Sequence, residues 1–386
     1  MGSGRFLLLL LISGMLTGCW HSSPVQEQMF NTYLQHLSRV LDVAQPAPLS
    51  LQPVYLPEKR EFLPRFPPLN LGLLESYQLR NCGLFQLISE RNSILGKVQD
   101  QFHRFEYEIR LIQQIEICLK DKTLKPQTKQ KLKQIRQMKQ KRLPYHWLSL
   151  LYASSAMRQQ LGGHEWYQPD VPASVIKPAL HMLNQVHGYV LLNQNVLLNQ
   201  NVLSNQNVLS NQNVPSNQEH RSSQQNGSNQ AIHSDNQPDL IALRDLKRHP
   251  GQMLLTRIQE PLEKQKILGH LFFSMNNAAL RLNQITDFLI LKSNQIQCGK
   301  NRDNTKARYL KNVFQQFYIG EIQPYLANTD ATYLSVQPLL GFLQPVVPDQ
   351  QYLYPIDEIH LKFRDAILKH TRYWQTFSAR CHISLR

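Results

Sequence analysis

Apolar side chains recur every three to four residues along most of this 386-residue chain. That spacing is typical of amphipathic helices, whereas alternation with a period of two is typical of strands. Strand-like alternation is nearly absent, and only the apolar stretch 336–347 is ambiguous. The pattern therefore predicts an all-α protein that folds as an irregular multi-helix bundle.

Individual helices are predicted from the ranges over which the spacing persists. They are 25–44, 74–88, 102–119, 127–142, 144–157, 261–293, 304–326, 331–337 and 356–379. Ser93 and Gly96 should separate the second from the third, and Pro144 should open the fifth. The longest, 261–293, would measure about 50 Å at the helical rise per residue.

Two segments lack the helical spacing. Residues 45–68 contain seven prolines and predict a Pro-rich extended arm, because proline fixes φ and has no N–H to donate. Residues 188–237 begin with a six-residue repeat, VLLNQN, that decays to VPSNQ. A hexapeptide β-helix is one interpretation, but the copies are few and lack a cap. Because a tract rich in Asn, Gln and Ser buries little apolar surface, we expect a disordered insert.

The N-terminus has the pattern of an export signal. Arg5 precedes an apolar run, Phe6–Leu16, that is too short to cross a bilayer. The run ends in Leu16-Thr17-Gly18-Cys19, which resembles the lipobox of bacterial lipoproteins. The resemblance implies that Cys19 is lipidated and anchors the mature chain to the membrane. By resemblance to envelope sorting rules, Trp20 in place of Asp implies the outer membrane, facing the periplasm.

These segments give a domain organisation. A signal peptide (1–18) and a lipidated tether (19–24) precede one helical domain, whose halves, 25–187 and 238–386, flank the insert. At up to ~3.5 Å per residue, the tether reaches under ~20 Å. The folded part should therefore lie close to the membrane.

The net charge of +15 is concentrated in 120–142, where ten Lys or Arg accompany one acid, Asp121. Such a run in a cytosolic protein would suggest nucleic acid, but export argues against that partner. The candidate partners are then an anionic lipid, a saccharide or an envelope protein. The alternative is a solvated helix that packs through its thin apolar stripe. The candidate basic patch consists of Lys129, Lys131, Lys133 and Arg136.

Four cysteines remain besides Cys19, and an even number in an oxidising compartment suggests disulfides. Four cysteines allow three connectivities. We expect Cys82–Cys118 and Cys298–Cys381. A simple hairpin of straight helices would leave the first pair ~15 Å apart, so this pairing also requires an irregular connection. The alternative is four buried, reduced thiols.

The sequence contains no GxSxG, HExxH, CxxC or phosphate-loop motif, and no histidine pair has the helical spacing that favours a metal. We therefore predict no catalytic residue, metal ligand or cofactor. The most distinctive polar cluster follows a predicted helix. A helix cap with an ion pair is its simpler interpretation, and an anion or polar-ligand site is the other. The cluster consists of Glu90, Arg91, Asn92 and Lys97.

The sequence around Cys82 resembles a known family. Asn81-Cys82-Gly83-Leu84, the run 90–98 and Cys118 are together similar to Gram-negative envelope lipoproteins known only as DUF3080, a domain of unknown function. The resemblance covers about 30–381, whereas the insert and the strength of the basic run depart from it. It implies an envelope location but no activity.

We therefore expect a membrane-anchored envelope lipoprotein that acts as a non-catalytic helical scaffold or binding protein at the periplasmic membrane surface. The alternative is a periplasmic hydrolase without a recognisable motif, with Glu90 or a histidine as its base. A deep pocket with convergent ionisable groups around Glu90 or His103 would favour the hydrolase. A helical body without such a pocket would favour the scaffold.

Overall fold

The computed structural model describes residues 24–69, 71–209 and 255–385, and it leaves out the side chains of Leu73 and residues 195–209. Helices, turns and irregular segments make up these residues, and strands are absent from them. The all-α expectation is thereby confirmed. The described residues do not include the signal peptide, Cys19, nearly all of the tether, or the insert from residue 210 onward.

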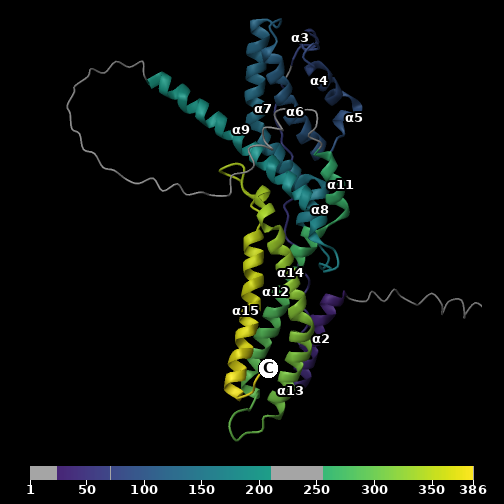
Figure 1. Ribbon diagram of the computed structural model, residues 1–386, viewed down its shortest axis with the longest axis vertical. Coiled ribbons are helices and arrows are strands. Elements are labelled where there is room, and N and C mark those ends of the chain that lie inside the picture. The colour runs from purple at the N-terminus through teal and green to yellow at the C-terminus, as the bar shows by residue number, and fades with distance from the viewer. Residues whose placement is uncertain (1–23, 70, 210–254, 386) are drawn as a thin grey trace, which may run out of the picture. The chain divides into compact units, whose positions relative to one another are not determined.

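The helices carry the labels used in Figure 1. They are α2 (Val25–Leu41), α3 (Leu73–Tyr77), α4 (Leu84–Asn92), α5 (Ile94–Lys97), α6 (Gln101–Lys120), α7 (Pro126–Ala153), α8 (Ser155–Leu161), α9 (Lys177–Leu209), α11 (Thr256–Lys264), α12 (Ile267–Lys292), α13 (Thr305–Val313), α14 (Gln323–Val336) and α15 (Ile356–Cys381). A π-helical stretch, Phe314–Ile322, joins α13 to α14. Short 3₁₀ turns occupy Lys59–Phe62, Ala173–Val175, Ser293–Gln295, Gln337–Leu339 and Gly341–Leu343.

The chain divides into two compact units. Unit 1 comprises Met1–Gln52, Ser274–Thr329 and Ile359–Arg386, and unit 2 comprises Pro53–Phe273 and Asp330–Glu358. Each unit takes residues from both sides of the insert. Both of the expected halves, 25–187 and 238–386, therefore contribute residues to each unit.

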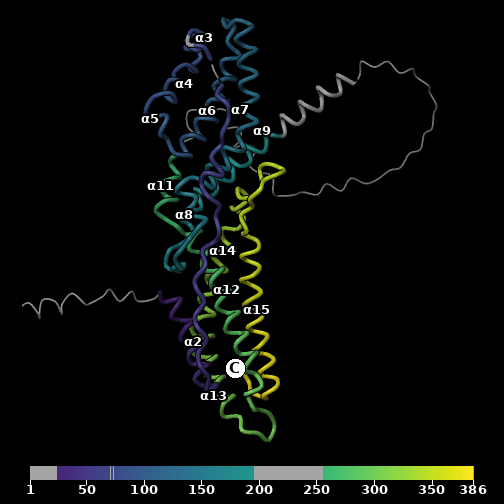
Figure 2. The backbone as a smooth tube through the Cα atoms, turned by 180° about the vertical axis from the view of Figure 1, so that it is seen from behind, coloured from purple at the N-terminus to yellow at the C-terminus, as the bar shows by residue number. Residues whose placement is uncertain are grey.

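Unit 1 is a bundle in which α2, α12, α13 and α15 lie side by side, as both backbone views show (Figures 1 and 2). Its core is aromatic around the buried His370. The ring of Phe314 stacks on that of Trp374 with 4.4 Å between centroids, and Tyr318 lies 4.5 Å from the His370 ring. The Cys298–Cys381 disulfide joins the end of α15 to the segment that follows α12.

The Pro-rich arm starts in unit 1, where it is extended beside α12. Asn277 accepts a hydrogen bond from the Gln52 N–H (2.8 Å) and donates one to the Gln52 carbonyl (3.0 Å). Five residues earlier in the arm, the Ala47 carbonyl accepts from Gln284 (2.7 Å). Since prolines supply no N–H groups, amide side chains on the helix provide the partners that a sheet would otherwise give.

Unit 2 is built on α6 and α7, which pack against each other along their length (Figure 2). The α4 helix covers α6 and closes a small core of Leu84, Leu87, Leu111, Ile115 and Leu132. The Cys82–Cys118 disulfide staples the turn before α4 to α6, with 5.2 Å between the Cα atoms. The irregular connection that this pairing requires is present, because α5 and a turn separate α4 from α6.

Two predicted helices are parts of longer ones, and a proline misled the prediction in the first case. Pro144 lies inside α7 instead of opening a new helix, so the predicted helices 127–142 and 144–157 are largely one. Buried Leu143 and Trp147 extend the packed stripe across the proline, which outweighs the loss of one backbone hydrogen bond. The predicted 331–337 helix is likewise the end of α14.

The longest predicted helix, 261–293, is interrupted near its start. The chain leaves α11 at Gln265 and begins α12 at Ile267. The buried side chain of Gln160 occupies the break, donating to the carbonyls of Leu262 (2.7 Å) and Gln265 and accepting from the Leu268 N–H (3.1 Å). One distant side chain thus replaces the helical bonds that the break removes.

The start of the expected insert is also corrected. The insert was expected to begin at residue 188, but α9 runs through that residue to Leu209. Its Tyr189 and Val190 are buried, and Asn193 accepts a hydrogen bond from Gln140 of α7 (3.2 Å). The first repeat residues thus continue a helix that packs against α7, which the polar composition of the tract concealed.

Candidate functional site

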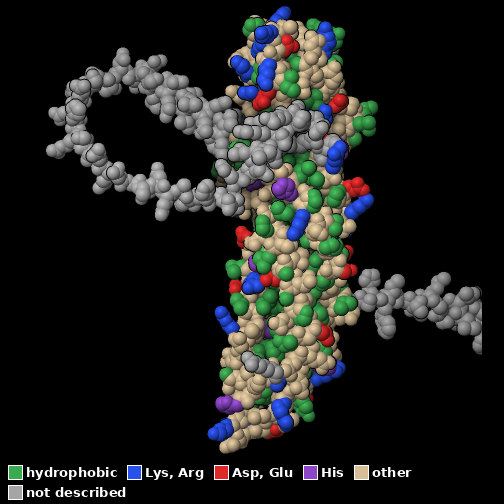
Figure 3. Space-filling view, viewed as in Figure 1, with side chains coloured by type: hydrophobic (Ala, Val, Ile, Leu, Met, Phe, Trp, Pro, Cys, Tyr) green, Lys and Arg blue, Asp and Glu red, His purple; other side chains and the backbone are tan. Residues whose placement is uncertain are grey.

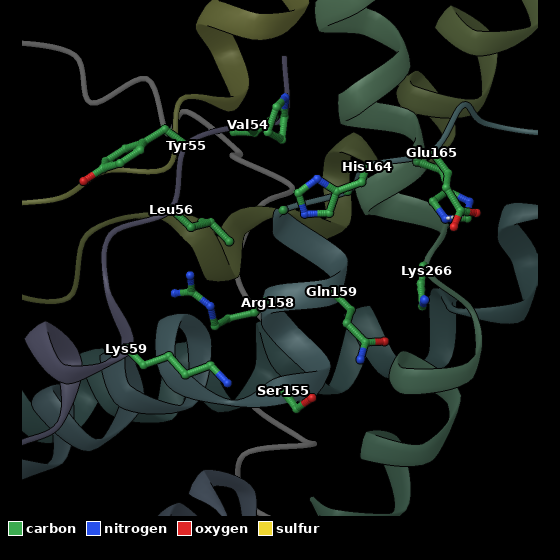
Figure 4. Close-up of a pocket in the computed structure, with 14 residues that line it drawn as sticks. Val54, Tyr55, Leu56, Lys59, Ser155, Arg158, Gln159, His164, Glu165 and Lys266 are labelled. Atoms are coloured by element: carbon green, nitrogen blue, oxygen red, sulfur yellow. Dashed lines mark ion pairs between the residues drawn. The ribbon is translucent and has the colours of Figure 1, made fainter. Parts of the chain in front are cut away.

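A cavity of about 510 Å³ opens in unit 2 between three parts of the chain (Figure 4). The arm contributes residues 53–56 and Lys59, α8 and the loop after it contribute Ser155, Arg158, Gln159 and 162–165, and the start of α12 contributes Lys266 and His270. This volume falls within the ~300–1,000 Å³ range of small-molecule sites. We call it the basic cavity.

Arg158 holds the arm against α8. Its Nη1 donates to the carbonyls of Pro57 (2.7 Å) and Tyr152 (2.9 Å). In Figure 4 its guanidinium lies between the side chains of Leu56 and Lys59. Because an arginine carries five N–H donors, donors other than those on Nη1 remain for a bound group.

The charge of the basic cavity is unbalanced. Its lining contains Lys59, Arg158 and Lys266 but a single acid, Glu165. The Glu165 carboxylate lies 3.6 Å from Nε2 of His270, and in the described part of the chain neither lysine forms an ion pair. Partial burial lowers the pKa of His270, which Glu165 opposes. At neutral pH the cavity therefore presents three cations and suits an anion.

The cavity lacks the coupling expected of a nucleophile. Ser155 is exposed at its edge and forms no hydrogen bond to His164 or His270 in the described structure. A serine nucleophile needs a base within hydrogen-bond reach. The arrangement favours binding by charge over acyl transfer.

The predicted polar cluster surrounds a helix cap. Ser93 accepts a hydrogen bond from the Gly96 N–H (3.0 Å), and the Arg91 guanidinium donates to the Gly96 carbonyl. The cavity that Glu90, Arg91 and His103 line measures about 60 Å³, well below the usual ligand pocket. Asn92 lines a different groove, and Lys97 is exposed.

The predicted basic patch lies along α7, and acids from neighbouring helices neutralise half of it. Lys131 pairs with Glu75 of α3, and Arg136 lies 3.6 Å from Glu116 of α6. The pairing lowers the pKa of Glu75. Lys129 and Lys133 have no ion pair in the described part of the chain.

A second hollow of about 560 Å³ runs between the arm, α4, α6 and α7. It contains a buried ion pair, in which Lys139 lies 2.8 Å from the Glu108 carboxylate, and His146 lies 3.8 Å from the same group. Burial lowers the pKa of His146, against the effect of Glu108. Lys139 and Glu108 therefore balance each other's charge inside this hollow.

Sequence reasoning missed the basic cavity because its cations are far apart in the chain. Lys59, Arg158 and Lys266 belong to no run and no motif. The only local signal is the pair of glycines at 162 and 163, which ends α8.

Neither a metal centre nor a membrane span appears in the part of the chain that the structure describes. His, Cys, Asp and Glu side chains do not gather there in groups of three or more that could hold an ion. None of the described helices combines the length and apolar content needed to cross a bilayer.

Comparison with known proteins gives one match. The family model DUF3080, described as a protein of unknown function, matches residues 30–226 and 195–385. No curated protein and no solved structure matches the chain.

Proposed function

The chain belongs to the DUF3080 family of proteins of unknown function, and we propose that it is a lipid-anchored, non-catalytic binding protein of the bacterial envelope that recognises an anionic ligand. The basic cavity carries the binding part of this proposal, because three cations face one acid in a space of ligand size. The rest of the helical body acts as the scaffold that supports the cavity.

The envelope location is supported by two independent features. The sequence Leu16-Thr17-Gly18-Cys19 fits a lipidation site, and the four cysteines that remain form two disulfides. Disulfides persist in oxidising, extracytoplasmic compartments. Trp20 after the lipidation site favours the outer membrane, with the body in the periplasm.

The anchor is tested by Cys19→Ser. This variant should accumulate as the unprocessed precursor and incorporate no palmitate, whereas the wild type should be labelled and fractionate with the outer membrane. Palmitate in the variant, or wild-type protein that fractionates with the inner membrane, would contradict the proposed anchoring.

The binding role is tested with the full mature chain in detergent, titrated with inorganic pyrophosphate in a calorimeter. The double variant Lys59→Gln/Lys266→Gln should bind at least about tenfold more weakly, since each charge-assisted contact contributes ~1.5–3 kcal/mol. Lys264→Gln is the matched control, because Lys264 is exposed near the cavity but pairs with Glu260.

Wild-type binding should also weaken as salt rises, because the rim lysines are exposed and screened. Equal affinity in the double variant and the control, or no dependence on salt, would remove the basic cavity as the binding site. Crosslinking in intact cells, followed by recovery of the membrane fraction, then identifies what the cavity holds.

A further inference from the structure

The short helix α5 displays apolar side chains to solvent. Ile94, Leu95 and Val98 have exposed fractions of 83%, 78% and 75%. Single exposed apolar residues are common, but a contiguous group is typical of an interaction site. Hydrophobic side chains project from the outline of the molecule over α5 in Figure 3. We call Ile94, Leu95 and Val98 the α5 tip.

The tip is held in a fixed conformation by the polar cluster that the sequence singled out. The Ser93 cap and the Arg91 guanidinium both bind the backbone of Gly96. Gly96 itself is buried against the end of α4, where an added Cβ would lie 2.6 Å from the Arg91 carbonyl oxygen. These contacts turn the chain so that the apolar side chains on either side of Gly96 point outward.

Cations surround the base of the tip. Arg91 precedes it, Lys97 is exposed within it, and Arg104 donates to the Lys97 carbonyl (3.3 Å). Of the nearby acids, Asp100 caps α6 and contacts His103 (3.1 Å), Glu106 is buried, and Glu90 is exposed. The tip therefore combines an apolar end with a predominantly cationic base.

We propose that the α5 tip inserts into an anionic lipid bilayer, with Ile94, Leu95 and Val98 below the headgroups and Arg91, Lys97 and Arg104 at the phosphates. This inference rests on the proposed lipid anchor, which would hold the chain at a membrane. Apolar side chains flanked by cations bind anionic interfaces in this manner. Three side chains are too few for a stable protein interface, which buries about 800 Å² on each partner.

The test uses the lipidated mature chain, in which Cys19 and both disulfides leave no free thiol. Leu95→Cys then carries the only thiol, which is labelled with the fluorophore NBD after reconstitution into vesicles. With phosphatidylglycerol present, NBD emission should shift to the blue, rise at least about twofold and be quenched by bromine-labelled acyl chains. Vesicles of phosphatidylcholine alone should give a smaller response.

Leu361→Cys is the matched control. Leu361 is also exposed (62%), but Asp357, Glu358 and Asp365 lie one turn away from it on α15. Its label should not respond to either vesicle. A second variant, Leu95→Cys with Ile94→Ser and Val98→Ser, changes only exposed side chains and should lose most of the response.

The mass of each preparation reports the lipid independently. A lipidated protein whose Leu95→Cys label stays in water overturns the tip inference and leaves the anchor standing, whereas an unlipidated mass contradicts the anchor. A label that responds equally to both vesicles, or only to a protein from the envelope, also overturns insertion into an anionic bilayer.

Discussion

Gly163 and Gly269 meet backbone to backbone, with no room for a side chain between them. A Cβ added to Gly163 would lie 2.7 Å from the Gly269 Cα and would overlap the Gly269 carbonyl. A Cβ added to Gly269 would in turn overlap the carbonyl of Gln159. This contact brings the loop after α8 onto the first turn of α12, and thereby sets the two sides of the basic cavity.

Gly269→Ala should therefore destabilise the protein by at least about 1–3 kcal/mol, because neither backbone can move away cheaply. Gly188→Ala is the matched control, since a Cβ there meets no atom within 4 Å inside α9. Removing a helical glycine should stabilise by roughly 0.5–1 kcal/mol. Urea denaturation of the two variants measures both effects, and equal midpoints would show that the glycine contact is absent.

The buried His370 should make the protein sensitive to acid. Trp374 and Tyr33 approach its Nε2 at 3.1 Å, so Nδ1 carries the proton and donates to Thr286 (2.9 Å). Burial lowers the pKa of this imidazole from 6.5 to about 3. In the unfolded chain the imidazole takes up a proton first, so the stability that it contributes is full above pH 6.5 and is lost between pH 6.5 and 3.

Across that window the free energy of unfolding should fall by up to ~1.4 kcal/mol per pH unit from this group alone. Denaturation midpoints at pH 7, 6 and 5 measure the slope, and His370→Gln should reduce it. A His370 ring resonance that titrates near pH 6.5 in the folded protein would contradict this assignment. The test is independent of any ligand.

The two disulfides should each contribute roughly 3–5 kcal/mol through loop closure. Peptide mapping of the unreduced protein should recover Cys82 with Cys118 and Cys298 with Cys381. Under oxidising conditions, the double variant Cys82→Ala/Cys118→Ala should have a lower melting temperature than the wild type. Once the wild type has been reduced, Cys82→Ala should change the melting temperature by less than that. Free thiols at all four positions, or a Cys82–Cys298 peptide, would show the connectivity to be wrong.

Helices with one clear apolar stripe were predictable from the sequence. The α2 and α15 helices begin where the spacing begins and end within three residues of the expected end, because a single buried face fixes their phase. The break between α4 and α5 was also predictable, since Ser93 is a strong N-cap. The predicted helix bounds were wrong where tertiary packing determines them. At Pro144 the helix continues because Leu143 and Trp147 are buried on either side of the proline.

The candidate site was much less predictable. The run 120–142 dominates the charge of the sequence, yet Lys131 and Arg136 find acids on α3 and α6 that no local pattern relates to them. No local sequence pattern marks Lys59, Arg158 and Lys266 as members of one site. They line the same cavity because the arm, α8 and the start of α12 pack together. Convergence of this kind is a property of tertiary packing, which periodicity does not report.

Gln160 offers the sharpest test of how the fold builds the basic cavity. It is fully buried, and it satisfies the Leu262 and Gln265 carbonyls and the Leu268 N–H where α11 gives way to α12. Gln160→Leu keeps the approximate volume but leaves these backbone groups without a partner. Since a buried unsatisfied group costs about 1–3 kcal/mol, the variant should lose at least ~3 kcal/mol of stability.

Hydrogen exchange at the Leu268 amide should accelerate beyond this global change, because the break between α11 and α12 opens first. Neighbouring Gln159→Leu is the control, since its amide forms no hydrogen bond in the described structure. If Gln160→Leu unfolds no earlier than Gln159→Leu and the Leu268 amide stays protected, Gln160 does not hold the break.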